Sequence, residues 1–293
     1  MSALIKIMSK TTLAFVLAVF LGSTIARAAE KEISTFPAYV DSDLCARLML
    51  GPITSKRVAC SQQTHKEGSQ PVLVRLSNDM VLDVNKQKMI EKFVGQLVEV
   101  SGELKVKDGE LKLQTVKPIE AGSIPAGDPS RKLLDVRTYR APGSPKMYEK
   151  IRHELAMMPY ISEFDFISFA MVGDNAILSG WTVRLTNRSD AENIVKNIEG
   201  VNAVVNNIEA LPLGSFDMRI RALARAALQT NLSRYFWGSG SDIKIIVKNG
   251  DVILLGAVTN SGDKDIANVR INQLPGVFHV FNLLRVAGSE QKG

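Results

Sequence analysis

The feature that most constrains this chain is an internal repeat in its C-terminal half, in which Ile177 corresponds to Ile253. This register holds without a gap from Ile177 to Asn206 in the first copy. The matching pairs are Ile177-Leu178 with Ile253-Leu254, Gly180 with Gly256, Ala191 with Ala267, Gly200-Val201 with Gly276-Val277, Val204 with Val280, and Asn206 with Asn282. One small folding unit is therefore expected twice.

Each copy has the same predicted order of elements, α-β-β-α-β. The first helices are expected at 147–158 and 216–233, and two strands follow around the turns Gly173-Asp174 and Asn249-Gly250. Asn-Gly is the strongest short hairpin signal. Ser189-Asp190-Ala191-Glu192 reads as a capping box that starts the second helix of copy one. Its apolar face is Ala191, Ile194, Val195 and Ile198.

The end of each copy is marked by glycine. Gly200 and Gly276 stand where a helix needs a left-handed C-terminal cap. A last strand is then expected at 204–208 and at 280–284. Copy two has about seven more residues between its first helix and its first strand, because Ile151 to Gly180 is shorter than Ile220 to Gly256.

This order resembles the BON domain family, with "L-x-G" in the second strand and "G-V-x-x-V-x-N" entering the last. The motifs read Leu178-Ser179-Gly180 with Gly200 to Asn206, and Leu254-Leu255-Gly256 with Gly276 to Asn282. The resemblance covers both copies of the repeat. It implies a periplasmic or envelope protein that contacts phospholipid surfaces or envelope polymers, and it implies no catalytic residues and no cofactor.

The first mature region predicts a small β unit. A strand pair is expected at 72–76 and 80–84, a short helix at 86–93, and then a strong alternation from Val98 to Val106. Asp108-Gly109 signals a hairpin turn. The run from Phe93 to Leu104 resembles the "F-x-G-x-x-V-x-V-x-G-x-L" core of OB-type modules in exported bacterial proteins, which implies an OB-like barrel. The aromatic platform for stacking single strands is missing.

The N-terminus has the pattern of a secretory signal peptide. Lys6 and Lys10 precede an apolar run from Thr11 to Gly22, and Ala26-Arg27-Ala28 fits a cleavage site. The alternative is an uncleaved anchor, but the run is short for a membrane span. Removal of 1–28 takes away three basic residues and no acidic one, so the formal charge falls from +6 to +3. Neither this charge nor export favours nucleic acid as a partner.

Cys45 and Cys60 are the two cysteines of the chain. In an oxidising compartment they are expected to form a disulfide. A metal site is the alternative, but the pair and the nearby His65 lack standard ligand spacing. The predicted organisation is thus an α+β chain with a signal peptide at 1–28, an OB-like β domain at 37–120, a linker at 121–145, and repeat modules at 146–213 and 214–287. The linker is rich in proline and glycine, and 133–139 could add one short strand.

The sequence contains few candidate catalytic residues. His153-Glu154 begins like a zinc motif, but position 157 is methionine, and no dinucleotide loop or nucleophile elbow is present. Asp263 and Asp265 read as charges at a helix N-terminus. A hydrolase that uses only carboxylates is the remote alternative to a non-enzymatic protein.

A basic segment that ends in aromatic residues is the candidate binding site. It consists of Arg219, Arg221 and Arg225 on the first helix of copy two, followed by Arg234, Tyr235, Phe236 and Trp237. Such a segment suits an anionic lipid surface. Alternatively, the arginines form a solvated helix face and the aromatics cover a sheet edge or a neighbouring module. Exposed aromatics would favour lipid or polymer binding, and packed aromatics would favour a scaffold subunit that docks only to proteins.

Overall fold

The computed structural model describes residues 33–106, 109–134, 145–237 and 241–287. The predicted signal peptide at 1–28 lies outside these residues. Within the described ranges, every helix is too short or too polar to span a bilayer.

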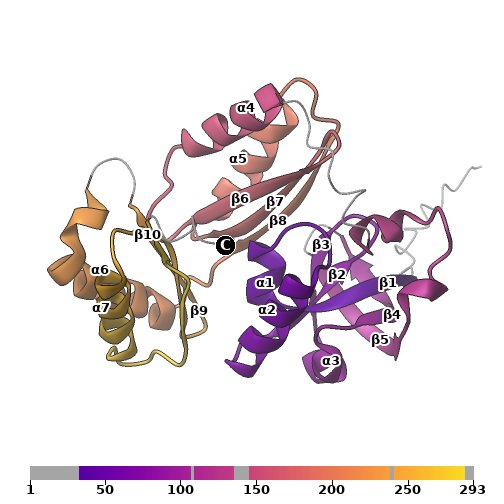
Figure 1. Cartoon of the computed structure of the whole chain (residues 1–293), viewed down its shortest axis with the longest axis horizontal. Coiled ribbons are helices and arrows are strands. Elements are labelled where there is room, and N and C mark those ends of the chain that lie inside the picture. The colour runs from indigo at the N-terminus through magenta and orange to yellow at the C-terminus, as the bar shows by residue number, and fades with distance from the viewer. Residues whose placement is uncertain (1–32, 107–108, 135–144, 238–240, 288–293) are drawn as a thin grey trace, which may run out of the picture. The chain divides into compact units, whose positions relative to one another are not determined.

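The N-terminal domain is a closed five-stranded barrel with the strand order β1-β2-β3-β5-β4 (Figure 1). Its strands are β1 (Ile33–Ser42), β2 (Pro71–Arg75), β3 (Met80–Val84), β4 (Leu97–Lys105) and β5 (Glu110–Pro118). All neighbours are antiparallel except β3 and β5. The predicted alternation is confirmed, since Val98 and Val100 lie fully buried in the barrel core. The register shifts at Ser101/Gly102, where a Cβ atom on Gly102 would overlap the carbonyl oxygen of Lys112.

Three helices accompany the barrel. The short helix predicted before β4 is present as α3 (Gln87–Ile90) and η1 (Glu91–Phe93). Helices α1 (Asp43–Leu48) and α2 (Ser55–Lys66) were not predicted. The side chains that α2 buries are Arg57, Ser61 and Thr64, so its buried stripe is polar. Hydrophobic periodicity cannot reveal a helix that buries polar residues.

The segment predicted as a linker contains local structure. Its first part forms η2 (Ala121–Ser123) and η3 (Pro129–Leu134), so Leu133 is helical and not the start of a strand. Ile124 and Leu133 are buried against the barrel, beside Tyr39 and Val74. Residues 135–144 lie outside the described part of the chain.

The two repeat modules follow with the predicted order of elements. Module one contains α4 (Pro145–Ala156), β6 (Phe166–Val172), β7 (Asn175–Thr182), α5 (Leu185–Lys196) and β8 (Ala203–Ala210). Module two contains α6 (Ser215–Leu232), η5 (Ser233–Phe236), β9 (Ile243–Lys248), β10 (Asp251–Val258), α7 (Ser261–Asn272), β11 (Val280–Asn282) and β12 (Arg285–Val286). In each module the first strand pair is antiparallel, and the later strands join in parallel. Both helices cover one face of their sheet (Figure 1).

The repeat extends to individual hydrogen bonds. The side-chain amide of Asn206 donates to the carbonyl of Arg188 at 2.9 Å, and that of Asn282 donates to Lys264 at 2.8 Å. In the register of the repeat the two donors are equivalent positions, and so are the two acceptors. The repeated asparagine therefore ties the second helix to the last strand in both copies.

Two local predictions were wrong. Helix α5 begins at Leu185, with Arg184 at its N-cap, so Ser189 lies inside the helix and its hydroxyl donates to the carbonyl of Thr186. The helix starts earlier because the second strand of the module ends at Thr182. Gly200 and Gly276 do have positive φ, at +91° and +88°. They lie in the turn beyond the helix, however, because α5 and α7 already end at Lys196 and Asn272.

The sheet faces that the helices leave open contribute residues to a further apolar cluster. Trp181 and Leu211 of module one pack against Ile253 and Phe281 of module two, and Leu44 of α1 joins the same apolar cluster. The two modules and the N-terminal domain therefore share one core in addition to their own.

Candidate functional site

Helix α6 carries the predicted arginines, but it does not present them as one surface. Arg219 is exposed on it. Arg225 is exposed and forms an ion pair with Glu163, with 2.9 Å between Nε and the carboxylate. Arg221 is buried, so its predicted role as a ligand contact does not agree with its position.

Arg221 links α6 to the segment before it and to β9 through hydrogen bonds. Its guanidinium donates to the carbonyls of Pro212 and Val247, at 2.8 and 2.7 Å. Burial lowers the pKa of Arg221, and the nearby Asp217 opposes that shift. Asp217 in turn accepts from the backbone amides of Asn249 and Gly250, so the start of α6 is fastened to the β9–β10 turn.

Tyr235 and Phe236 pack within module two and do not form an exposed aromatic surface. Tyr235 is buried, and its hydroxyl donates to Asp263 at 2.6 Å. Arg234 forms an ion pair with the same carboxylate and stacks on the Tyr235 ring. The hydrogen bond from Tyr235, followed by that from Arg234, lowers the pKa of Asp263. As predicted, Asp263 lies in the first turn of α7. Phe236 packs against the core of module two.

The exposed apolar side chains of this region lie at the two ends of α6. Trp237, just after η5, is 77% exposed, and Phe216, in the first turn, is 49% exposed. The Phe216 ring lies 5.9 Å from that of Phe278, which is also exposed. Sequence reasoning missed Phe278. The repeat contained the signal, because copy one has Asn202 at the equivalent position.

A largely buried charge network joins the N-terminal domain and the two repeat modules. Arg47 of α1 lies 2.7 Å from Asp43 and 3.1 Å from Glu209 of β8. Lys248 of β9 lies 2.8 Å from Asp43 and 2.7 Å from Glu209. Two cations and two carboxylates therefore compensate one another, which is the condition under which charges can be buried.

The network shifts the titration of its members. Burial would raise the pKa of Asp43, but Arg47 and Lys248 outweigh it and hold that pKa well below its usual range. For Glu209, burial dominates and raises the pKa. Opposed carboxylate pKa values are also found in acid–base catalysis. Here, however, both carboxylates form ion pairs within the network that joins the N-terminal domain to the two repeat modules (the junction), which suits a structural role.

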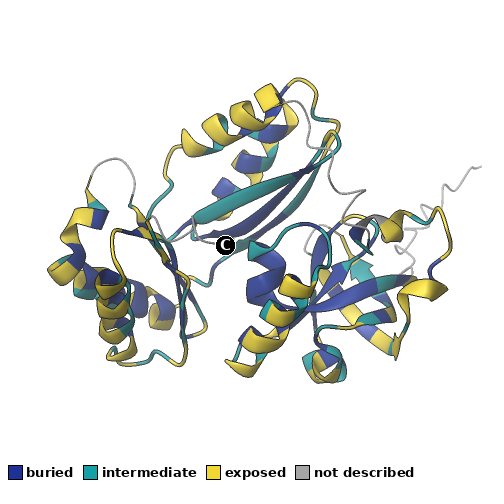
Figure 2. Ribbon diagram, viewed as in Figure 1, coloured by how far each residue is buried: buried dark blue, intermediate teal, exposed yellow. Residues whose placement is uncertain are grey.

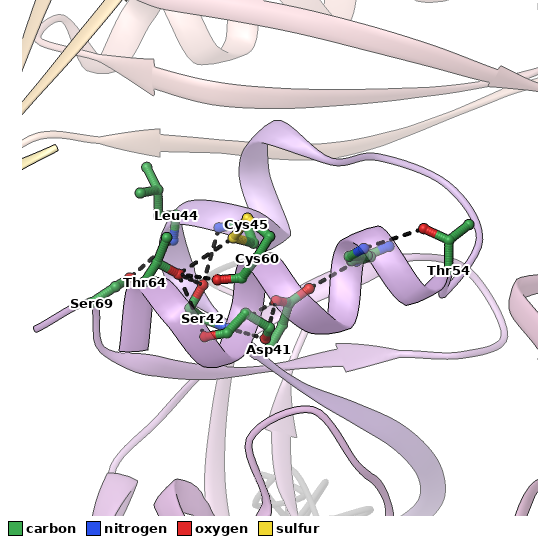
Figure 3. The surroundings of a disulfide bond; sticks show 10 residues. Asp41, Ser42, Leu44, Cys45, Thr54, Cys60, Thr64 and Ser69 are labelled. Carbon is green, nitrogen blue, oxygen red and sulfur yellow. Dashed lines mark hydrogen bonds and ion pairs between the residues drawn. A yellow bond between two sulfur atoms is a disulfide. The ribbon is translucent and has the colours of Figure 1, made fainter. Parts of the chain in front are cut away.

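A second polar cluster surrounds the predicted disulfide, which the structure contains. Cys45 of α1 and Cys60 of α2 are bonded, with 6.1 Å between their Cα atoms (Figure 3). Beside them, Asp41 accepts from Arg57 Nε at 2.8 Å and from the Ser61 hydroxyl at 2.7 Å. The disulfide therefore fastens together the two helices that hold Asp43, Arg47 and Arg57.

No group of three His, Cys, Asp or Glu side chains in the described part of the chain is arranged to hold a metal ion. His153 is exposed on α4. His65 contacts the carbonyl of Ser69 at 2.9 Å, and His279 contacts Asp251 at 2.7 Å.

Comparison with known proteins identifies the repeat modules. A family profile described as "BON domain" matches residues 148–212 and again residues 217–288. No protein with a curated description matches the chain. Two solved structures of CdsD, a structural protein of the type III secretion system of Chlamydia trachomatis, are similar at 12% identity with a TM-score of 0.19. The similarity covers 49% of this chain and 98% or 94% of theirs, and the first is described as the C-terminal domain.

Proposed function

Because residues 148–212 and 217–288 are two tandem BON domains, we propose that this chain is a non-enzymatic binding protein of the cell envelope. The proposed partner is an anionic phospholipid surface, and the proposed contact is the outer face of α6 with the residues that follow it. The N-terminal barrel is proposed to be of the OB type. Its strand order, with the parallel pair β3–β5 closing the circle, supports that assignment.

The observation that carries the proposal is the pair of exposed aromatic side chains at the two ends of α6. Phe216 lies in the first turn of the 18-residue helix α6, Trp237 follows η5 beyond the end of α6, and Arg219 is exposed between them. A helix that lies on a membrane places apolar side chains among the acyl chains and its basic groups at the phosphates. Of the seven predicted contact residues, Arg219, Arg234 and Trp237 keep this role in the proposal, and Phe216 is added.

Co-sedimentation with vesicles tests the proposal. We expect the full chain to bind vesicles of phosphatidylglycerol and phosphatidylcholine more tightly than vesicles of phosphatidylcholine alone. F216S/W237S should weaken binding by about tenfold or more, because the two exposed aromatic side chains proposed to insert among the acyl chains are lost. Tyr148→Ser is the matched control, since Tyr148 is an exposed aromatic residue on the first helix of module one. Equal binding by wild type and F216S/W237S would exclude this contact.

A scaffold subunit is the second candidate. The packed Tyr235 and Phe236 and the shared core between the modules favour it. In that case we expect the chain not to bind vesicles of either composition. We expect it to be recovered in complex with envelope proteins after chemical crosslinking in whole cells.

A further inference from the structure

The two BON domains have equivalent edge strands that differ in how well they are protected against pairing with another chain. The register that aligns Ile177 with Ile253 also aligns 167–172 of β6 with 243–248 of β9. Among the described strands, β6 pairs only with β7, and β9 pairs only with β10. Each strand therefore has an outer side on which no further strand is added.

The outer side of β9 is protected against pairing. Lys244 and Lys248 place two charges in a strand of six residues. The backbone amide of Ile245 donates to the carbonyl of Glu163 at 2.7 Å, and Lys244 Nζ donates to that of Ser162 at 3.0 Å. Charged side chains and covering segments are the usual devices that prevent edge strands from recruiting another chain.

Strand β6 carries no charged side chain, and among the described residues no backbone amide or carbonyl of another segment bonds to its outer side. Its sequence is Phe-Ile-Ser-Phe-Ala-Met-Val, without charge or proline, and its pairing with β7 contains no register shift. Ser168 and Val172 occupy the positions at which β9 has Lys244 and Lys248. Six of its seven residues are partly exposed, and Figure 2 shows most of the strand in the colour of intermediate exposure.

A groove lies beside β6. It has a volume of about 440 Å³, and its walls include Leu155 of α4, Ile167 and Phe169 of β6, and Lys244 of β9. Ser241 and Asp242, just before β9, border the same groove, so the space between β6 and the start of β9 is open. An open, regular and uncharged edge of seven residues is a template for one more strand.

We propose that β6 pairs antiparallel with β6 of a second copy of this chain, so that two three-stranded sheets become one six-stranded sheet. The strand complements itself when the pairing is centred on Phe169. Ile167 then faces Met171 of the second copy, Ser168 faces Ala170, and Phe166 faces Val172. No like charges meet, apolar residues oppose apolar residues, and the arrangement closes with two-fold symmetry. The proposal does not depend on lipid binding.

The test is the oligomeric state of the full chain across a concentration series, by sedimentation velocity. We expect a reversible dimer. S168K/V172K, which gives β6 the lysines of β9, should raise the dimer dissociation constant by at least about tenfold, because the added lysines then lie diagonally opposite one another across the pair. Q114K/Q273K adds the same charge at two exposed glutamines and should leave the constant unchanged.

Hydrogen exchange on the wild type provides a second measurement that needs no variant. Amides of 166–172 should become better protected as protein concentration rises, while those of 243–248 should not change. A chain that stays monomeric at every concentration overturns the proposal, and so does a dimer that is insensitive to S168K/V172K. A monomer whose β6 amides gain protection only from an added foreign peptide also overturns self-pairing.

Discussion

Gly180 and Gly256 have backbone φ angles of +123° and +111°, a region that side chains rarely adopt. A Cβ atom at Gly180 would overlap the carbonyl oxygen of Phe166 in β6, and one at Gly256 would overlap that of Asp242, just before β9. These two acceptors are again equivalent positions in the register of the repeat. The repeated glycine is therefore required by the close approach of two backbones, independently of any ligand.

Gly256→Ala should lower the free energy of unfolding by about 3 kcal/mol or more, because strain and steric overlap act together. Urea denaturation followed by circular dichroism measures the change. Gly173→Ala is the control: its φ is also positive, at +59°, but no heavy atom lies within 4 Å of the added Cβ. This substitution should cost about 1 kcal/mol. Equal costs would show that overlap with the carbonyl of Asp242 is unimportant.

Asp43 connects the barrel side of the junction to Lys248 of module two. Because its pKa is depressed in the folded chain, its contribution to stability is present above the pKa of an unfolded aspartate, about 3.9. The contribution declines as the pH falls below that value. Its charge compensates two cations, the buried Arg47 and the half-buried Lys248.

Asp43→Asn should destabilise the chain by about 3 kcal/mol at pH 7, because the buried Arg47 and the half-buried Lys248 then share only Glu209. The difference from wild type should shrink below about pH 4, where the wild-type contribution is itself being lost. Urea midpoints of both proteins between pH 2.5 and pH 7 measure this. A difference that is constant with pH would mean that the substitution disturbs packing and not charge.

At the scale of the element, the two equivalent helices α5 and α7 start differently. Asn260 caps α7, and its side chain accepts from the backbone amide of Asp263. Helix α5 has Arg184 at the N-cap and no side-chain cap. The repeat preserves the helix, but not the way in which it begins.

Asn260→Ala should cost about 1 kcal/mol, the usual value for the loss of an N-cap. Ser189→Ala should stay within about 0.5 kcal/mol, because Ser189 lies within α5 on the exposed side. Thermal unfolding of the two variants separates these outcomes. A larger loss for Ser189→Ala would restore the predicted capping box.

At the scale of the whole molecule, two groups of side chains each join the barrel and both repeat modules. One is the apolar cluster around Trp181, and the other is the network of Asp43, Arg47, Glu209 and Lys248. Arg47 also donates to the carbonyl of Asn207 at 2.6 Å, and the Asn207 side chain donates to that of Asp79 at 2.7 Å. Barrel and modules are therefore expected to unfold as one body.

Calorimetry should show a single transition whose calorimetric and van't Hoff enthalpies agree. Arg47→Ala removes the cation that bridges α1 and β8, and it should split or broaden that transition by leaving Asp43 and Glu209 with Lys248 alone. Arg152→Ala is the control, since its ion pair with Glu149 is exposed. Two resolved transitions in the wild type would contradict the shared junction.

Much of the architecture was accessible from the sequence because it depends on periodicity and turns. Asn249-Gly250 predicted the β9–β10 hairpin, because both residues readily adopt the left-handed φ angles that the turn requires. Val98 and Val100 identified the core face of β4. Helices α1 and α2 were missed because they bury Arg47, Arg57 and Ser61, whose partners are distant in sequence. The candidate site was only partly accessible, since exposure separates Trp237 from Tyr235, two residues earlier.

The sequence by itself determined the duplicated unit, its order of elements, the cysteine pair and the apolar faces of the strands. These follow from local chemistry: backbone geometry at glycine and asparagine, and alternation along a strand. Only the tertiary structure decided which arginines of α6 brace the fold and which reach solvent, and that three modules share a buried charge network. The reason is that burial of a charge depends on partners from other segments, here β8 and β9 for Arg47 and its neighbours, and no local pattern records them.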